Sequence, residues 1–139
     1  GAPPAPDAVT GTGVFYDAPA GLRRPLAAAY LGAYYLLGMA AAGHHVLWGS
    51  NMALRRHAWE AVRTRVHRED REVHDDMDLA LVMGPEATIR LRPGLRVGVS
   101  ARSLVGLAQL RRRFRRAFRT LELNWADAPP WERWVRRRR

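Results

Sequence analysis

The feature that most constrains the fold is an uncharged segment of 18 residues, 26–43. Arg23 and Arg24 precede it, and His44 and His45 follow it. The segment is long enough for a helix that crosses a bilayer, but ten of its residues are alanine or glycine, which gain little from transfer into hydrocarbon. The composition therefore favours a buried helix rich in Ala and Tyr over a transmembrane helix.

The size and charge of the chain limit the functions that it can have. A chain of 139 residues, 47% of them hydrophobic, suits one domain with a core of ordinary size. The absence of cysteine excludes disulfides and thiolate metal sites and is consistent with a reducing compartment. Residues 111–139 contain eleven arginines and three acids, so this segment carries +8 of the total charge of +10. Such a segment attracts polyanions: nucleic acid, anionic lipid headgroups or a nucleotide diphosphate.

Local patterns in the first half of the chain predict alternating strands and helices. Residues 8–11 and 14–16 are expected to form two short strands or one bent strand, and a turn at 17–19 precedes the uncharged helix. A short strand is expected at 46–48. An amphipathic helix is expected at 54–66, where apolar residues recur at every fourth position.

The second half of the chain is expected to contain a hairpin and a long basic helix. Residues 87–91 and 95–99 are predicted to pair as a hairpin across the turn sequence at 92–94 (RPG). The helix that follows residue 102 carries one apolar stripe, formed by Leu104, Leu107, Leu110, Phe114, Ala117 and Leu121, with Phe118 beside it. Residues 123–139 are predicted to be a basic tail that contains tryptophan.

Acidic residues are most concentrated at 74–79 (HDDMDL), directly before an apolar run that ends at a glycine and a proline, 84–85. Asp75 is predicted to be the N-cap of a short helix, and Asp78 to complete a capping box. The helix dipole favours negative charge at this end. Capping does not require Asp76, and local chemistry alone leaves a functional role for this residue open.

Two segments in this order resemble motifs of family 2 glycosyltransferases of the GT-A fold: residues 49–56 (GSNMALRR) and 74–79. The family has G-(S/A)-N-x-A-(L/F)-R-(R/K), then (H/T)-E-D-x-(D/E)-L, then a strand ending in V-x-x-S-x-R, represented here at 94–102, and an Arg-rich helix. The resemblance covers roughly residues 9–120. It implies that residues 1–122 form the C-terminal part of a GT-A catalytic domain, an α/β structure of short strands, flanking helices and a long basic C-terminal helix.

The resemblance also implies roles for individual residues. Asp76 would be the general base of an inverting transferase, taking the proton from an acceptor hydroxyl as that oxygen attacks the anomeric carbon of a nucleotide sugar. Asp75, which replaces the usual Glu, would act with Asp78 on the helix end and the electrostatics around the base. Gly49 and Asn51 would belong to the loop beside the acceptor.

Four residues are candidates for binding the phosphates of the donor: Arg102, Gln109, Arg112 and Arg116. Arginine suits this task because its guanidinium can bind a phosphate in a bidentate manner. Gln109 begins a partial match to the Q/R-x-x-R-W motif of processive members, but Arg113 stands where the motif has Trp. Processive synthesis is therefore not inferred.

Members of this family bind the donor with an N-terminal half, in which a D-x-D motif holds Mg²⁺ or Mn²⁺ against the diphosphate. No D-x-D that follows a strand occurs before Gly11. We therefore expect the divalent metal in a full-length enzyme, no metal ligands in this chain, and no activity from the chain alone, as for a fragment. The implied partners are a nucleotide-sugar donor and a glycan or lipid-linked acceptor, in cell-envelope polysaccharide synthesis. The implied location is the cytoplasm, with peripheral contact at the inner face of the membrane as an option.

The main alternative is a small basic module that binds nucleic acid or an anionic membrane surface, with tryptophan and arginine side by side in the tail. Its affinity should fall steeply with salt and should survive Asp76→Asn. In the complete enzyme, the same substitution should abolish transfer. A relative with a purely structural role is a third option. The order of the motifs favours the glycosyltransferase and argues against nucleic acid as the partner.

Overall fold

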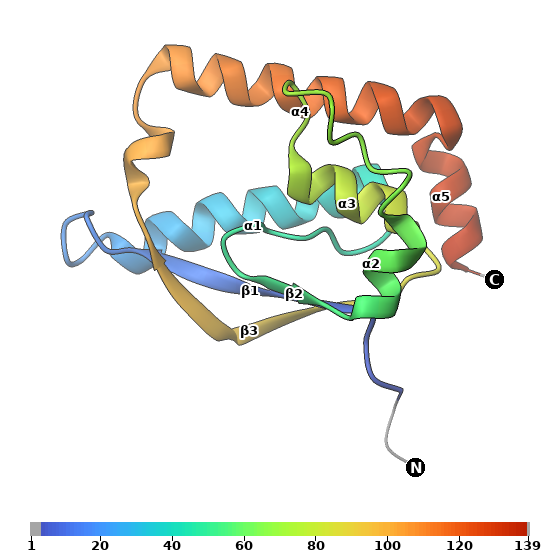
Figure 1. Cartoon of the computed structure of the whole chain (residues 1–139). Helices are drawn as coiled ribbons and strands as arrows, with labels where there is room; N and C mark the ends of the chain where they lie inside the picture. The colour runs from blue at the N-terminus through green and yellow to red at the C-terminus, as the bar shows by residue number, and fades with distance from the viewer. Residues whose placement is uncertain (1–3, 139) are drawn as a thin grey trace.

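The computed structural model describes residues 4–138, which form a mixed α/β fold around a small three-stranded sheet. The strands are β1 (Ala8–Phe15), β2 (Met52–Leu54) and β3 (Ile89–Val99), in the order β2-β1-β3. The helices are α1 (Arg23–Ala42), α2 (Arg56–Val62), α3 (Asp75–Met83), the short 3₁₀ helix η1 (Ala101–Leu104), α4 (Leu107–Asp127) and α5 (Pro130–Arg137). Figure 1 shows α1 and α3 in a layer above the sheet and α4 across the top. The prediction of an α/β fold is confirmed at this level.

The uncharged segment forms α1, and only one of its faces is buried. Ala27, Leu31, Tyr35, Gly38 and Ala42 recur on that face and pack toward the sheet. The opposite face is exposed, so the prediction of a buried helix is wrong for half of its surface. By length and composition α1 is the one helix among residues 4–138 that could cross a membrane, yet 28% of its most apolar window is buried inside the protein.

Residues 46–48 were expected to form a strand, and this prediction is wrong. They are buried, but their backbone runs as an irregular segment held by side chains. The Trp48 N–H donates to the Thr10 hydroxyl at 3.0 Å, and the Leu47 carbonyl accepts from the Tyr34 hydroxyl at 2.5 Å. The strand is β2 instead. Because Leu54 pairs with Ala8 in the sheet, α2 begins two residues later than predicted and also ends earlier, at Val62.

The hairpin predicted across residues 92–94 is also wrong, because β3 is one strand that runs parallel to β1. Thr10 pairs with Leu91 and Thr12 with Arg96, so residues 92–95 bulge out opposite Gly11. The Thr12 hydroxyl donates to the Pro93 carbonyl at 3.0 Å and holds this bulge. The turn sequence thus bends β3 without reversing it. Of the two alternatives for residues 8–16, the structure has one strand, β1, and not two.

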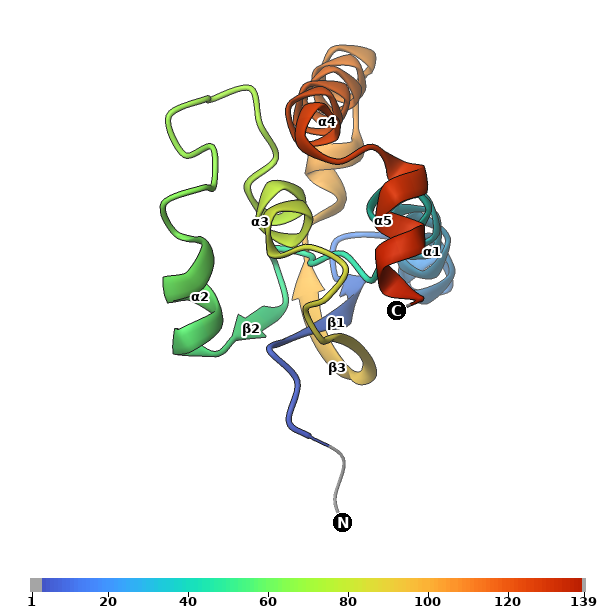
Figure 2. The same ribbon diagram turned by 90° about the vertical axis from the view of Figure 1, so that its right-hand side faces the viewer.

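Helix α4 confirms the predicted long basic helix, but most of its apolar stripe does not face the core: Leu121 packs against it, whereas Leu107, Leu110, Phe114 and Phe118 are exposed. The fully buried positions of α4 are Thr120 and Asn124, both polar. The helix continues without a break past residue 122 to Asp127, and α5 then packs beside α1 (Figure 2). Arg133 of α5 is buried and donates to the carbonyls of Leu81, Asn124 and Ala128.

Candidate functional site

The three carboxylates of the acidic segment all lie in the first turn of α3, but in different environments. His74 is the N-cap residue and makes no side-chain capping bond, so the predicted capping by Asp75 and the capping box are wrong. Asp75 is exposed, Asp76 is partly buried, and Asp78 is only 2% exposed. The three carboxylates of this short motif therefore lie in three different environments, and the contacts of each one determine what it can do.

Asp76 is oriented by two backbone donors that come from different parts of the chain. The Gly49 N–H donates to its Oδ2 at 2.8 Å, and the Met77 N–H donates to its Oδ1 at 2.8 Å. A Cβ atom at position 49 would lie 3.3 Å from Oδ2, so glycine allows this close approach. Each carboxylate oxygen has two lone pairs and accepts one of these bonds, which leaves acceptor capacity for a proton. The carboxylate is thus held in a defined direction while it remains accessible.

Tyr34 of α1 lies beside Asp76, and the sequence interpretation did not include it. Burial raises the pKa of the Tyr34 hydroxyl, and the negative charge of Asp76 raises this pKa further. The phenol therefore stays protonated and donates to the Leu47 carbonyl. Its position in a segment made mostly of Ala, Leu and Gly is the sequence feature that could have pointed to it, because a buried tyrosine usually finds a partner for its hydroxyl.

Asn51 positions the loop that carries Gly49. Its side-chain amide donates to the carbonyls of Thr12 at 3.0 Å and Leu95 at 2.9 Å, on both sides of the bulge between β1 and β3. Its own carbonyl accepts from the Gly11 N–H at 2.9 Å. These three bonds all join Asn51 to the sheet, so Asn51 acts on Asp76 through the loop and not by direct contact.

Asp78 joins three parts of the structure. Its Oδ2 accepts from the His67 N–H at 2.8 Å, and its Oδ1 lies 2.7 Å from the His67 ring Nδ1 and accepts from the Asn124 amide at 2.7 Å. Since an ionised carboxylate can only accept, the His67 ring must donate from Nδ1. Asp78 therefore ties α3 to α4 and to the loop that follows α2, and its side chain has no route to a substrate.

The four candidate phosphate ligands are dispersed. Arg102 lies on η1 and bonds to the Ser100 hydroxyl at 3.1 Å, while Gln109 and Arg112 are exposed on α4. Arg116 donates to the Val73 carbonyl at 2.6 Å, three residues before Asp76. The structure thus brings Arg116 near the start of α3 in a structural contact, and it does not gather the other three there.

The resemblance to family 2 glycosyltransferases implies a divalent metal in the full-length enzyme. Among residues 4–138, no group of three or more His, Asp or Glu side chains is placed to bind a metal ion. Asp76 faces backbone donors, and Asp78 is saturated by His67 and Asn124. These residues do not fit a divalent cation, and the metal remains a prediction for the donor half.

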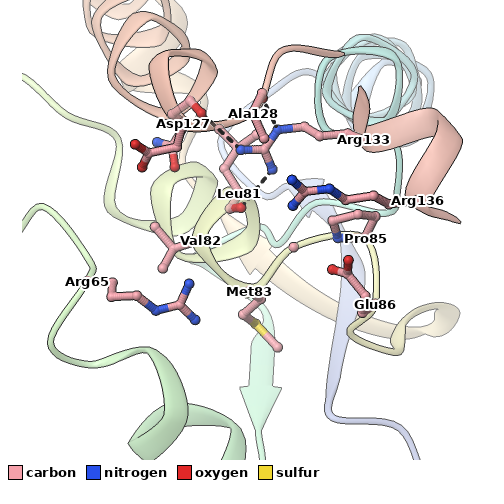
Figure 3. A pocket seen from close by; sticks show the side chains of 12 residues that line it. Arg65, Leu81, Val82, Met83, Pro85, Glu86, Asp127, Ala128, Arg133 and Arg136 are labelled. Atoms are coloured by element: carbon pink, nitrogen blue, oxygen red, sulfur yellow. Dashed lines mark hydrogen bonds between the residues drawn. The ribbon is translucent and has the colours of Figure 1, made fainter. Parts of the chain in front are cut away.

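A hollow of about 470 Å³ lies at the opposite end of α3 from the carboxylates. It is lined by residues from the end of α3, from α5 and from the loop after α2, including Leu81, Glu86, Arg65, Arg133 and Arg136 (Figure 3). At the wall of this hollow, the Arg133 guanidinium donates to the carbonyls of Leu81 and Asn124. None of the residues that line it belongs to the predicted site, so the candidate site is the open surface around Asp76 and not this hollow.

Searches with models of protein families, among curated proteins and among solved structures found no match to this chain.

Proposed function

We propose that this chain provides the catalytic-base part of an inverting glycosyltransferase, which moves a sugar from a nucleotide sugar to a hydroxyl acceptor. The observation that supports this most is the Asp76 carboxylate, which two backbone N–H groups orient at an accessible helix start. The small mixed sheet with helices packed on it is compatible with a part of a GT-A fold. The order of the sequence motifs supplies the reaction type.

In the proposed reaction, the acceptor hydroxyl hydrogen-bonds to a free lone pair of Asp76. As its oxygen forms a bond to the anomeric carbon, the proton moves to the carboxylate and the bond to the nucleoside diphosphate breaks on the opposite face. Attack from one side and departure from the other invert the anomeric carbon. Asp76 then returns its proton to water. Gly49 and Met77 serve to hold the carboxylate toward the acceptor, which saves the entropy of orienting a free side chain.

Donor binding belongs to a different part of such an enzyme. The divalent metal, when bound there, would neutralise the diphosphate as it leaves. Residues of this chain would contribute the base and the positioning of the acceptor.

A sugar-transfer assay tests the proposal, on a polypeptide that joins this chain to a donor- and metal-binding half. Asp76→Asn keeps the shape of the side chain but removes the base, and it should lower kcat at least about a hundredfold. Donor affinity should change less than about threefold, since the base does not contact the nucleotide. The neighbouring Asp75→Asn is the matched control, because Asp75 is exposed, and it should retain activity to within about tenfold.

Two results would contradict the proposal. The first is that Asp76→Asn keeps more than about a tenth of the wild-type kcat. The second is that Asp75→Asn and Asp76→Asn reduce kcat equally, because general negative charge at the helix start would then account for both. Circular dichroism spectra of the variants separate a loss of chemistry from a loss of folding.

A further inference from the structure

Helix α4 exposes the apolar side of an amphipathic helix to solvent. Thr120 and Asn124 occupy its buried positions, and Leu121 packs against the core, whereas four other large apolar residues are exposed. The exposed fractions are 82% for Leu107, 40% for Leu110, 57% for Phe114 and 68% for Phe118. Their spacing of three, four and four residues places them on one side of the helix. Contiguous exposed apolar surface of this kind marks a site of interaction.

This stripe lies on the side of α4 that meets α1. Trp125 follows Phe118 by seven residues and therefore lies in line with the stripe, and its indole N–H donates to the Ala41 carbonyl of α1 at 3.1 Å. A second link joins Arg113 of α4 to the Tyr30 hydroxyl at 2.8 Å. Figures 1 and 2 show the two helices running in the same direction and approaching each other at their C-terminal ends.

Exposed leucines of α1 lie beside the same junction. Leu26 lies one helical turn before Tyr30, and Leu37 lies one turn before Ala41. Because Tyr30 and Ala41 both bond to α4, the two leucines lie on the α4 side of α1. Leu37 is 71% exposed and Leu26 is 45% exposed. We call the combined surface the α1–α4 face; it consists of Leu26, Leu37, Leu107, Leu110, Phe114 and Phe118.

The charges around this face indicate what covers it. Arg111 precedes Phe114 by three residues and Phe118 by seven, so its guanidinium borders the stripe. Arg115 is exposed and precedes Phe118 by three residues, so it borders the stripe as well. The α1 side carries no charge between residues 26 and 43. Arginines can extend to phosphates while their stems and the adjacent phenyl rings lie in the acyl region. Nucleic acid would use the arginines but would leave an uncharged leucine and alanine surface unused.

The packing of α1 determines how it can meet a bilayer. The Tyr35 hydroxyl donates to the Gly11 carbonyl at 2.6 Å and the Tyr34 hydroxyl donates to the Leu47 carbonyl, so the inward part of α1 is fixed to the sheet and the loop. The helix can therefore contact lipid only along its exposed side, lying in the plane of the interface.

We propose that the α1–α4 face binds the surface of an anionic phospholipid bilayer. Phe114, Phe118 and the leucines enter the boundary between headgroups and acyl chains, while Arg111 and Arg115 bind lipid phosphates. This proposal does not rest on glycosyl transfer, because it concerns a different surface from the Asp76 carboxylate. If both proposals hold, the base lies near the face at which a lipid-linked acceptor is delivered, since Tyr34, beside Asp76, follows Tyr30 by one helical turn.

Sedimentation with vesicles tests the proposal on the 139-residue chain. The protein should bind vesicles of equimolar phosphatidylcholine and phosphatidylglycerol and should bind phosphatidylcholine alone at least about tenfold more weakly. Phe118→Asp and Leu37→Asp should each lower the partition coefficient on mixed vesicles about tenfold or more, one from each helix. Leu95→Asp is the matched control: this leucine of β3 is 49% exposed, and its substitution should change binding less than about twofold.

A second pair of variants tests the charge. Arg111→Gln with Arg115→Gln should weaken binding about tenfold. Arg92→Gln with Arg96→Gln, which removes equal charge from β3, should weaken it less than about threefold. Equal losses from both pairs, or from Phe118→Asp and Leu95→Asp, would overturn the proposal, because binding would then depend only on net charge. It would also be overturned if Phe118→Asp dissociated a dimer, measured by light scattering, without changing vesicle binding.

Discussion

Replacing Asp78 with asparagine tests whether the acidic segment stabilises the fold through its third carboxylate. The substitution keeps the volume and changes only the hydrogen bonding. Asp78 accepts three bonds, two from His67 and one from Asn124, at 2.7 to 2.8 Å, and it is 2% exposed. An asparagine oxygen can replace Oδ1, but its NH₂ group then faces the His67 N–H, donor against donor. Leaving a buried donor without a partner costs about 1–3 kcal/mol, and weakening the two remaining charge-assisted bonds adds about 1 kcal/mol.

The expected loss of stability is therefore about 3 kcal/mol, and the melting temperature should fall by roughly 10 °C for a chain of this size. Urea unfolding followed by circular dichroism measures the free energy, with Asp75→Asn as a control at an exposed position in the same turn. The control should stay within about 0.5 kcal/mol of the wild type. A loss below about 1 kcal/mol for Asp78→Asn would refute the reasoning, since it would mean that water or a local shift satisfies His67 and Asn124.

Two further predictions follow from buried groups. Arg133→Met should lower the free energy of unfolding by about 2–4 kcal/mol, because three carbonyls lose a buried donor. The control is Arg136→Met, at a half-exposed position of the same helix, which should cost less than about 0.5 kcal/mol in the same urea experiment. Burial lowers the pKa of His44 from 6.5 to about 4. As the pH falls, His44 therefore takes up its proton in the unfolded chain at a higher pH than in the folded chain. His44 should therefore contribute no loss of stability above pH 6.5 and a loss of about 3 kcal/mol as the pH falls from 6.5 to 4. The difference in the free energy of unfolding between wild type and His44→Gln, measured across this pH range, isolates the effect. Parallel plots of this free energy against pH for the two proteins would contradict it.

Elements that depend on local sequence could be predicted. Gly43 ends α1 with a φ of 78°, and Gly84 ends α3 with a φ of 83°, both in the region that favours glycine. The period of α4 predicted a helix, and its length is near that expected. Glycine position and helical period act within a few residues, and a single sequence contains that information.

Elements that depend on distant partners could not be predicted. The sequence at 92–94 is suited to a turn, but β3 pairs with β1 on both sides of it, and these parallel contacts join residues about 80 positions apart. Likewise, the period of α4 does not say which side faces inward. Its inner side is set by Asp78 and His74, to which Asn124 and Thr120 bond, and apolar spacing carries no information about a polar anchor of this kind.

The same distinction separates the three carboxylates of the acidic segment. In the sequence they are equivalent candidates for capping, charge or catalysis. In the structure, Asp78 accepts hydrogen bonds from a loop and from α4. Asp75 is exposed, and no hydrogen bond from residues 4–138 orients its side chain. Asp76 alone combines access with two fixed donors, one of which comes from Gly49, 27 residues earlier in the chain. A general base needs both properties at once, because a buried carboxylate cannot reach the acceptor and a free one must be oriented in every turnover. This combination is the reason to test Asp76 before its neighbours.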